Sequence, residues 1–367
     1  MTWRRRAAAI AMATAGAALL VSGCGGGGPD AEEEAIEAAE DFLDRYLDPS
    51  GRIVRTDQGS DTVSEGQAYG MLFAVALGDE ERFRDIWGWT DVNLQRDDGL
   101  LSWRWADGEI VDGEPAGDAD LLAATALAFA ARRFADPDLL TDAGLINDAI
   151  IANETMTFDE AIVLAAGPWA VSQRVINPSY LVTPAMSGLF WRLDESRWAD
   201  VAATSREMLD ELTEQAPHLP PDWATVDADG DHPEPQASPA GETPRYGWEA
   251  GRVLVQLAVD CRGTGQRIAA RAWPFLEDEI DHDRLVAVYS MDGEALVSTE
   301  HPLALVAAAS SAAAAGERER AAELLDEADE LDDDTATYYG AAWIALARLW
   351  HDTDLLGACR PGHPTTP

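Results

Sequence analysis

Three segments of the sequence contain the acidic residues best placed to do chemistry. Glu65 lies in TVSEGQAYGM, Asp118 and Asp120 lie in PAGDADLLAATALAFA, and Glu249 lies in RYGWEAGRV. Each acid stands at the start of an apolar, helix-forming stretch. A helix N-terminus stabilises a carboxylate through its free amide groups and its dipole. Helix capping alone therefore explains each acid taken singly.

A shared cleft explains the acids better when they are taken together. Aromatic residues gather in the loops beside them, at Trp103, Trp105, Tyr180, Tyr246 and Trp248. Burying several carboxyl groups together separates their pKa values. Hydrolysis of an acetal needs such a separation, because one group must protonate the leaving oxygen while another activates a water. Aromatic faces also stack on sugar rings, so these residues predict a glycan-cleaving site.

Helical patterns that could position these residues follow one another along the chain. Roughly every second pattern is apolar and alanine-rich on nearly all sides, while its neighbour is amphipathic with an acidic face. This alternation predicts an all-α protein with an inner and an outer layer, an (α/α)6 barrel or six-hairpin toroid, in one domain over 35–360. A long bundle or solenoid is the alternative, but no fixed-period repeat supports it. The expected helices are 33–48, 64–79, 80–95, 119–134, 137–153, 178–193, 196–215, 244–260, 265–280, 301–316, 317–331 and 335–350.

The composition excludes several chemistries. All 26 basic residues are arginine, and the formal net charge over 367 residues is −41. Without lysine there is no Schiff-base lysine and no P-loop lysine, and binding to nucleic-acid phosphates would meet strong repulsion. Such an acidic surface suits high salt. DADGD (227–231) differs from a calcium loop in the place of its glycine, so we expect no metal. No cofactor is expected either, because two carboxyl groups and a water suffice.

The N-terminus has the pattern of an export signal. Residues 1–23 combine a basic start with a short apolar stretch, and VSGC with four glycines resembles the lipobox of bacterial lipoproteins. We expect a lipidated Cys24, a flexible linker over 24–34, and a protein on the outer face of the cytoplasmic membrane, or secreted if Cys24 is a chance residue. Cys261 and Cys359 could form a disulfide after export. We expect a monomer that meets the membrane only through its anchor.

Several segments resemble glycoside hydrolase family 8, a group of inverting (α/α)6-barrel enzymes. TVSEGQAYGML resembles the segment with the family's general acid, which implies that role for Glu65. AGDADLLAATALAFAARRF resembles the family signature, in which Asp118 would hold the sugar in the cleavage subsite and Gly117 replaces a Ser or Thr. INPSYLVTPA resembles the segment that places Tyr180 near the water.

Two more segments resemble the family's cleft, and a third departs from its pattern. DGLLSWRW resembles the stacking-tryptophan loop, and YYGAAWIAL resembles a terminal helix whose tyrosine, Tyr338 here, borders the cleft. In WEAGR, Glu249 takes the place of the family's aspartate base and Trp248 that of a tyrosine, while Arg252 is retained. One extra methylene moves a carboxylate by about 1 Å, which an inverting site can accommodate. Some chitosan-cleaving relatives use a base from an inserted loop, where Asp227, Asp229 and Asp231 are the candidates.

The resemblance implies an inverting endo-β-1,4-glucanase with Glu65 as acid, Glu249 as base and Asp118 holding the sugar. A xylan- or chitosan-specific hydrolase is an alternative within the family. A lipoprotein that binds glycan without cleaving it is a second alternative, and a magnesium-dependent terpenoid cyclase using Asp118 and Asp120 is a third. The implied substrate-binding residues are Trp103, Trp105, Asp120, Tyr180, Tyr246, Trp248, Arg252 and Tyr338.

Overall fold

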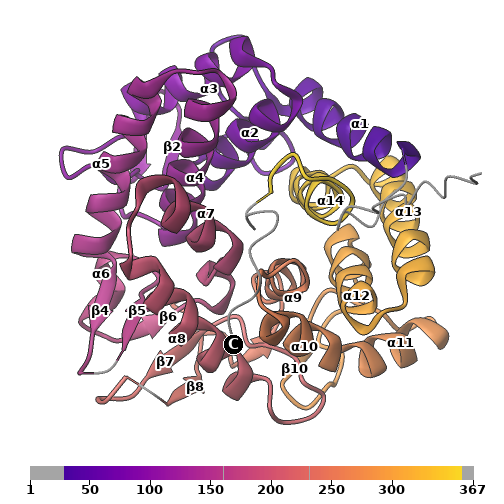
Figure 1. Ribbon diagram of the computed structural model, residues 1–367. Helices are drawn as coiled ribbons and strands as arrows, with labels where there is room; N and C mark the ends of the chain where they lie inside the picture. The colour runs from indigo at the N-terminus through magenta and orange to yellow at the C-terminus, as the bar shows by residue number, and fades with distance from the viewer. Residues whose placement is uncertain (1–28, 160, 231, 358–367) are drawn as a thin grey trace, which may run out of the picture.

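The computed structural model describes residues 29–159, 161–230 and 232–357. Its helices form a closed ring in two layers (Figure 1). The inner layer consists of α2 (Ser64–Leu77), α4 (Gly117–Arg133), α7 (Thr183–Leu193), α9 (Gly251–Ala258), α12 (Pro302–Ala315) and α14 (Tyr338–Asp352). The outer layer consists of α1 (Pro29–Tyr46), α3 (Glu80–Asn93), α5 (Pro137–Asn153), α8 (Arg197–Leu212), α10 (Gly263–Arg271), α11 (Trp273–Asp281) and α13 (Arg318–Asp334). This is the two-layer barrel that the sequence predicts.

The pair α12 and α13 shows why the layers separate. Most of α12 is buried, and its sequence PLALVAAASSAAAA offers small apolar side chains in every direction. In α13 the buried residues Ala321, Leu324, Leu325 and Ala328 recur at the three- and four-residue spacing of one helix face. The acidic residues between them face the solvent. Each helix pattern therefore decides its own layer.

The ring closes where the last helix meets the first. Helix α14 contacts α1, α2, α12 and α13. Arg348 of α14 is buried, and its guanidinium donates to Glu34 of α1 and Asp326 of α13, each at 2.9 Å, and also to Asp329. A buried guanidinium needs such partners because an unpaired charge is costly to desolvate. This network ties the two ends of the described chain together.

Among the described residues, short antiparallel strands, which the helical patterns do not predict, form four small sheets. Each strand lies in a connection that leads from an outer helix to the next inner helix. The sheets therefore gather where the inner helices begin. Their strands are β1 (Thr62–Val63) with β2 (Arg104–Ala106) and β3 (Glu109–Asp112), β4 (Thr155–Thr157) with β5 (Ile162–Leu164), β6 (Val175–Ile176) with β7 (Ala224–Val226) and β8 (Pro233–Pro235), and β9 (Arg245–Tyr246) with β10 (Tyr289–Ser290). The same connections hold the short helix α6 (Pro168–Val171) and the 3-10 helix η1 (Pro178–Tyr180).

Four expected elements differ from the structure. The helix expected over 178–193 is divided into η1 and α7, which begins only at Thr183. The helix expected over 244–260 begins only at Gly251, because residues 245–246 pair with β10 and a turn follows. The helix expected over 265–280 is divided at Ala272 into α10 and α11. Helix α1 begins at Pro29, inside the stretch expected as a linker, and has acidic residues in its first turn.

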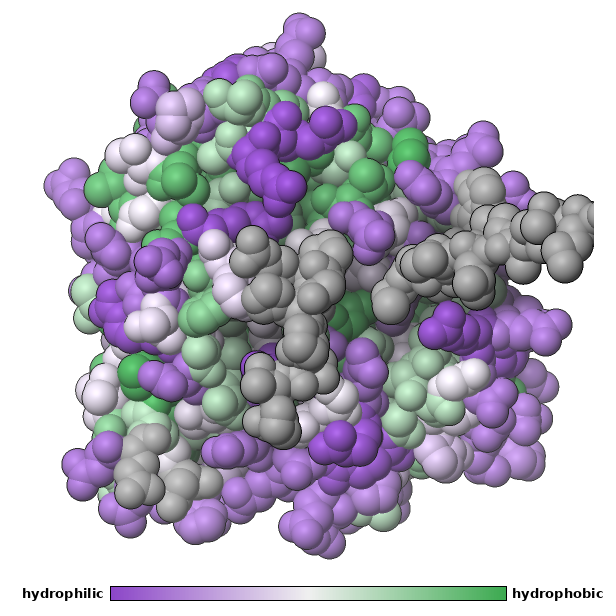
Figure 2. Space-filling model, in the orientation of Figure 1, coloured by the Kyte–Doolittle hydropathy of each residue, from purple (hydrophilic) through white to green (hydrophobic). Residues whose placement is uncertain are grey.

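The expected leader and two cysteines fall outside the described residues. These are residues 1–23, Cys24 and Cys359. Cys261 is disulfide-bonded. Across the described ranges, no helix has both the length and the apolar character needed to cross a membrane. Hydrophilic residues cover most of the periphery of the ring, and hydrophobic ones lie nearer its centre (Figure 2).

Candidate active site

A cleft of about 360 Å³ contains residues from both the early and the late parts of the chain. A cleft of this size can hold a sugar unit of a longer chain. Glu65 and Glu249, the acid and base implied by the sequence, both line it. Its lining residues are Arg55, Asp57, Gln58, Val63, Glu65, Tyr69, Trp103, Trp248, Glu249, Arg252, His301, Thr337, Tyr338 and Tyr339.

Glu65 lies in the first turn of α2 and is partly exposed to the cleft. The indole Nε1 of Trp103 donates a hydrogen bond to its Oε2 at 3.1 Å. Burial, with the negative charge of Asp118 added to it, raises the pKa of Glu65 to about 7. Near neutral pH this carboxyl group can therefore hold a proton and give it up.

The residues after Glu65 show how α2 presents it. Gln67 is fully buried on another side of the helix, where its Nε2 donates to Thr90 Oγ1 at 2.8 Å and its Oε1 accepts from the Ile53 amide at 2.6 Å. These bonds fasten α2 to α3 and to the preceding loop. Tyr69 stands one turn beyond Glu65, on the same face, and lines the cleft. We did not single out Tyr69 from the sequence, although its four-residue spacing from Glu65 could have revealed it.

The two aspartates of α4 point in different directions. Asp118 is 1% exposed; its Oδ1 accepts from the Ala119 amide at 2.9 Å and its Oδ2 accepts from Arg252 at 2.8 Å. Asp120 is fully buried, and its Oδ1 accepts from the Leu101 amide at 2.8 Å. Two residues along a helix turn a side chain by about 200°. Asp120, expected to bind substrate, therefore anchors a loop and is not among the cleft-lining residues.

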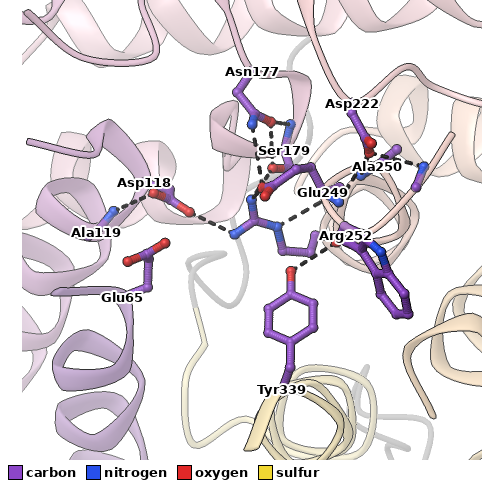
Figure 3. Close-up of polar contacts among 12 residues, drawn as sticks. Glu65, Asp118, Ala119, Asn177, Ser179, Asp222, Glu249, Ala250, Arg252 and Tyr339 are labelled. Atoms are coloured by element: carbon purple, nitrogen blue, oxygen red, sulfur yellow. Dashed lines mark hydrogen bonds and ion pairs between the residues drawn. The ribbon is translucent and has the colours of Figure 1, made fainter. Parts of the chain in front are cut away.

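Arg252 connects Asp118 to Glu249 across the floor of the site (Figure 3). Its guanidinium is buried and also donates to Ser179 Oγ at 2.6 Å. Glu249 accepts from this guanidinium through Oε2, and the same oxygen lies 3.4 Å from the side-chain Nδ2 of Asn177. Because 34% of its side chain is exposed, Glu249 can reach a substrate while its ion pair with Arg252 is retained.

Aromatic rings line the cleft beside these acids. Trp103 and Trp248 both line it, as the sequence predicts, and so does Tyr338. The ring of His301 packs edge-on against Trp248 with 4.9 Å between centroids. The hydroxyl of Tyr339 donates to the Trp248 carbonyl at 2.9 Å. These contacts fix the indole ring as one wall of the site.

Three aromatic residues expected in the cleft are not among the residues that line it. Trp105 packs on the Arg52 guanidinium, 4.2 Å from its ring centroid, next to a register shift in the pairing of β2 with β3. Tyr246 is buried against Tyr289. Tyr180 is buried beneath the site, with the Arg252 guanidinium 5.5 Å from its ring centroid.

Several cleft residues had no clear signal in the sequence. His301 caps α12 by accepting from the Leu303 amide at 3.1 Å, and burial lowers its pKa to about 4, so its ring is neutral near pH 7. Asp57 belongs to the loop TDQGSD before α2, which the sequence marks only as polar, and Arg55 immediately precedes this loop. Asp227 accepts from the Gly230 amide in the turn before β8 and is not a cleft residue. Within the described ranges, no group of three acidic, histidine or cysteine side chains is arranged to hold a metal.

The fold and the cleft together define a class of protein. A closed double layer of helices presents one carboxyl group with a pKa of about 7, a second carboxyl group held by an arginine, and two indole rings that line the same cleft. Paired carboxyl groups of different basicity are the machinery of glycosidic bond hydrolysis. These features are those of a helical-barrel carbohydrate hydrolase.

The chain belongs to the glycosyl hydrolases family 8, whose pattern matches residues 29–353. A probable endoglucanase of Novacetimonas hansenii is 34% identical over 250 residues, which cover 66% of this chain and 72% of that protein. An endoglucanase of Cellulomonas uda is 31% identical over 232 residues, which cover 61% of this chain and 63% of that protein. The predicted family is therefore confirmed.

Solved structures agree with this assignment. The endo-β-1,4-glucanase CMCax of Acetobacter xylinum has a TM-score of 0.73 at 29% identity, covering 87% of this chain and 99% of that one. The family 8 endoglucanase Cel10 of Klebsiella pneumoniae has a TM-score of 0.72 at 27% identity, covering 85% of this chain and 98% of that one. The protein is a glycoside hydrolase, and its (α/α)6-barrel fold is confirmed.

Proposed function

We propose that this protein is an inverting endo-β-1,4-glucanase in which Glu65 is the general acid and Glu249 the general base. The observation that carries the proposal is that both side chains line one cleft and that Glu65 has a pKa of about 7. The names of the relatives support β-1,4-glucan as the substrate. Xylan and chitosan are the alternative substrates, and the activity panel described below includes both.

The chemistry follows from the two protonation states. Protonated Glu65 gives its proton to the glycosidic oxygen as the bond from that oxygen to the anomeric carbon breaks. Glu249 takes a proton from a water whose oxygen attacks the same carbon from the opposite face, so the configuration inverts. Solvent then returns the proton to Glu65 and removes the one on Glu249.

The contacts of Glu249 suit a base that stays ionised. Both its bond from Arg252 and its contact with Asn177 use Oε2, and the hydrogen bonds found among the described residues leave Oε1 for a water. Asp118 contributes by its charge, which helps to keep the proton on Glu65. Asp118 is almost completely buried and is not among the cleft-lining residues, so its expected hold on the sugar stays a prediction.

One observation favours a second candidate, a protein that binds glycan without cleaving it. A carboxylate paired with a buried guanidinium is a weaker base than a free one. If Arg252 kept Glu249 from accepting a proton, the aromatic cleft would still bind sugar. Calorimetry with soluble oligosaccharides would then show binding without release of reducing ends.

The test is an activity panel on carboxymethyl-cellulose, mixed-linkage β-glucan, xylan and chitosan. Wild type should release reducing ends from at least one of them, with the inverted anomer seen first by NMR. Glu65→Gln and Glu249→Gln should each lose about 10²- to 10⁴-fold in rate. Glu323→Gln, an exposed acid on α13, is the matched control and should match wild type. Activity on none of the substrates, or full activity of either site variant, would overturn the proposal.

We also infer that the protein is exported and lipid-anchored through Cys24. The support is the basic and apolar leader followed by VSGC in the sequence. Cys24→Ala should move the protein from the membrane fraction to the soluble fraction of the producing cells or to the medium. Equal membrane association of both forms would contradict the anchor.

A further inference from the structure

We propose that Asp222 is a positioning residue for Glu249, an inference that rests on the proposed role of Glu249 as the base. Asp222 precedes β7 and is 5% exposed. Its Oδ1 accepts hydrogen bonds from the backbone amides of Gly247 at 3.0 Å, Glu249 at 3.1 Å and Ala250 at 2.9 Å (Figure 3). One carboxylate oxygen thus holds the backbone turn that presents the base.

The start of α9 explains why this turn needs an acceptor from elsewhere. The first amides of a helix have no partner within the helix and are usually capped by a Ser, Thr, Asp or Asn just before it. The first amides of α9, those of Gly251 and Arg252, donate to the carbonyls of the preceding turn at 3.2 Å. The amides of the turn 247–250 have no backbone acceptor among the described residues, and Ala250 has no side-chain acceptor. Asp222 supplies the missing acceptor from 28 residues earlier in the chain. Its charge strengthens the bonds, because ionised acceptors bind amides more strongly than neutral ones.

Asp222 is itself held from several sides. Its backbone amide donates to the Arg245 carbonyl at 2.8 Å, and its Oδ2 lies 3.3 Å from Arg245 Nε. A Cβ placed on Gly247 would lie only 2.5 Å from Oδ2, so only glycine allows the turn to approach this closely. The carboxylate therefore has little freedom to move, and neither does the turn that it holds.

This rigidity bears on catalysis because Glu249 is a long side chain. Its carboxylate end is held by Arg252 and Asn177, and its backbone is held by Asp222. Catalytic groups need to be held within about 0.5 Å of the productive geometry. A misplacement of about 1 Å can cost about 10²-fold in rate. Asp222 never touches the substrate in this scheme, because it acts through the backbone of Glu249.

The test compares Asp222→Ala, Glu249→Gln and the double variant in the full-length protein. Asp222→Ala should lower kcat about 10²-fold on the best substrate while KM stays within about twofold, because the aromatic walls still bind the glycan. The double variant should be no slower than Glu249→Gln alone, because a positioning residue has nothing to position once the base is gone. A merely structural residue would slow both backgrounds equally.

Two more variants keep the test decisive if Asp222→Ala does not fold. Asp222→Asn retains an acceptor oxygen and should lose about tenfold in kcat, between wild type and Asp222→Ala. Gly247→Ala keeps the carboxylate but pushes it away from the turn, and should lower kcat in the same way.

The matched control for these variants is Asp260→Asn. Asp260 is a buried acid that accepts from Thr183 at 2.8 Å and pairs with Arg206, away from the cleft. The control should lower Tm without changing kcat. An active wild type whose kcat survives Asp222→Ala or Gly247→Ala, or equal losses in both backgrounds, would overturn this inference alone. A wild type inactive on every substrate would overturn the proposed function first.

Discussion

At the scale of single residues, the carboxyl group of Glu65 combines burial with a neighbouring negative charge, and its pKa of about 7 follows from both. If this group must be protonated to act, kcat/KM should fall by about tenfold per pH unit above pH 7. A pH profile on the best substrate measures this limb. A rate that stays level between pH 6 and 9 would show that another group supplies the proton.

The same pKa can be checked through folding, without any substrate. The folded value lies above the ordinary 4.5, so the native state binds more protons and stability declines as pH rises from about 4.5 to 7. Glu65→Gln removes this ionisation. The variant should be more stable than wild type at pH 8 by on the order of 1–3 kcal/mol, and nearly equal at pH 4. Thermal unfolding at both pH values gives the answer, and an equal gap at both would argue for a normal carboxyl group.

How far the sequence could predict the site depends on the kind of contact. Glu65 stands at the start of α2 and Trp103 lies in the aromatic loop between α3 and α4, and both line the cleft. The contact of Trp105 with Arg52 could not be predicted, because it depends on strand pairing and on a segment far away in the sequence. His301 packs against Trp248 and Asp222 holds the turn before α9, so both contact segments far away in the sequence and no local spacing marks these contacts.

At the scale of helices, the packing of α2 against α14 depends on a glycine beside the proposed acid. A Cβ on Gly66 would lie 2.6 Å from the Tyr338 hydroxyl and 3.4 Å from Ile53. Gly66→Ala should therefore push α2 and α14 apart and destabilise the protein by about 1–3 kcal/mol. It should also lower activity, because Glu65 and Tyr338 both line the cleft. Chemical denaturation and the reducing-end assay measure the two effects.

Gly88 in α3 provides the matched control for Gly66. It is exposed, and no atom lies within 4 Å of a Cβ placed on it. Gly88→Ala should stabilise the protein by about 0.5–1 kcal/mol, because alanine restricts the unfolded chain and favours helix. If Gly66→Ala and Gly88→Ala lowered the free energy of unfolding by similar amounts, close packing at Gly66 would not be the cause.

The helices also show which structure is encoded locally. The helix over 137–153 has the predicted bounds, with Asp136 as its cap and Pro137 in its first turn. The helix expected over 244–260 lost its first residues because pairing with β10 and the bonds to Asp222 compete with helix formation there. Helical periodicity thus predicted the layers, whereas the connections that complete the site depend on contacts between distant segments.

At the scale of the whole molecule, charge repulsion is the largest feature that salt can change. The 26 arginines can neutralise at most 26 of the 67 acidic residues. Exposed ion pairs contribute little, so screening should relieve more repulsion than the attraction it weakens. Tm should rise by roughly 5 °C between about 0.05 and 1 M NaCl. Scanning calorimetry measures this, and a Tm that is flat or falls with salt would contradict it.

A charge variant separates screening from other effects of salt. Glu330, Asp333 and Asp334 are exposed near the C-terminal end of α13, where negative charge opposes the helix dipole. Replacing them with Gln, Asn and Asn should raise Tm at low salt. The gain should shrink at 1 M NaCl if screening is responsible.

Because α14 closes the ring, the cleft is complete only after α14 has been synthesised. Tyr338 and Tyr339 line the cleft together with Glu65, and α1 gains its α14 neighbour only when residues 338–352 exist. A nascent chain that has not reached residue 338 already contains Glu65, Asp118 and Glu249 but has an unfinished cleft. A stop codon before residue 338 therefore removes the enzyme rather than trimming it.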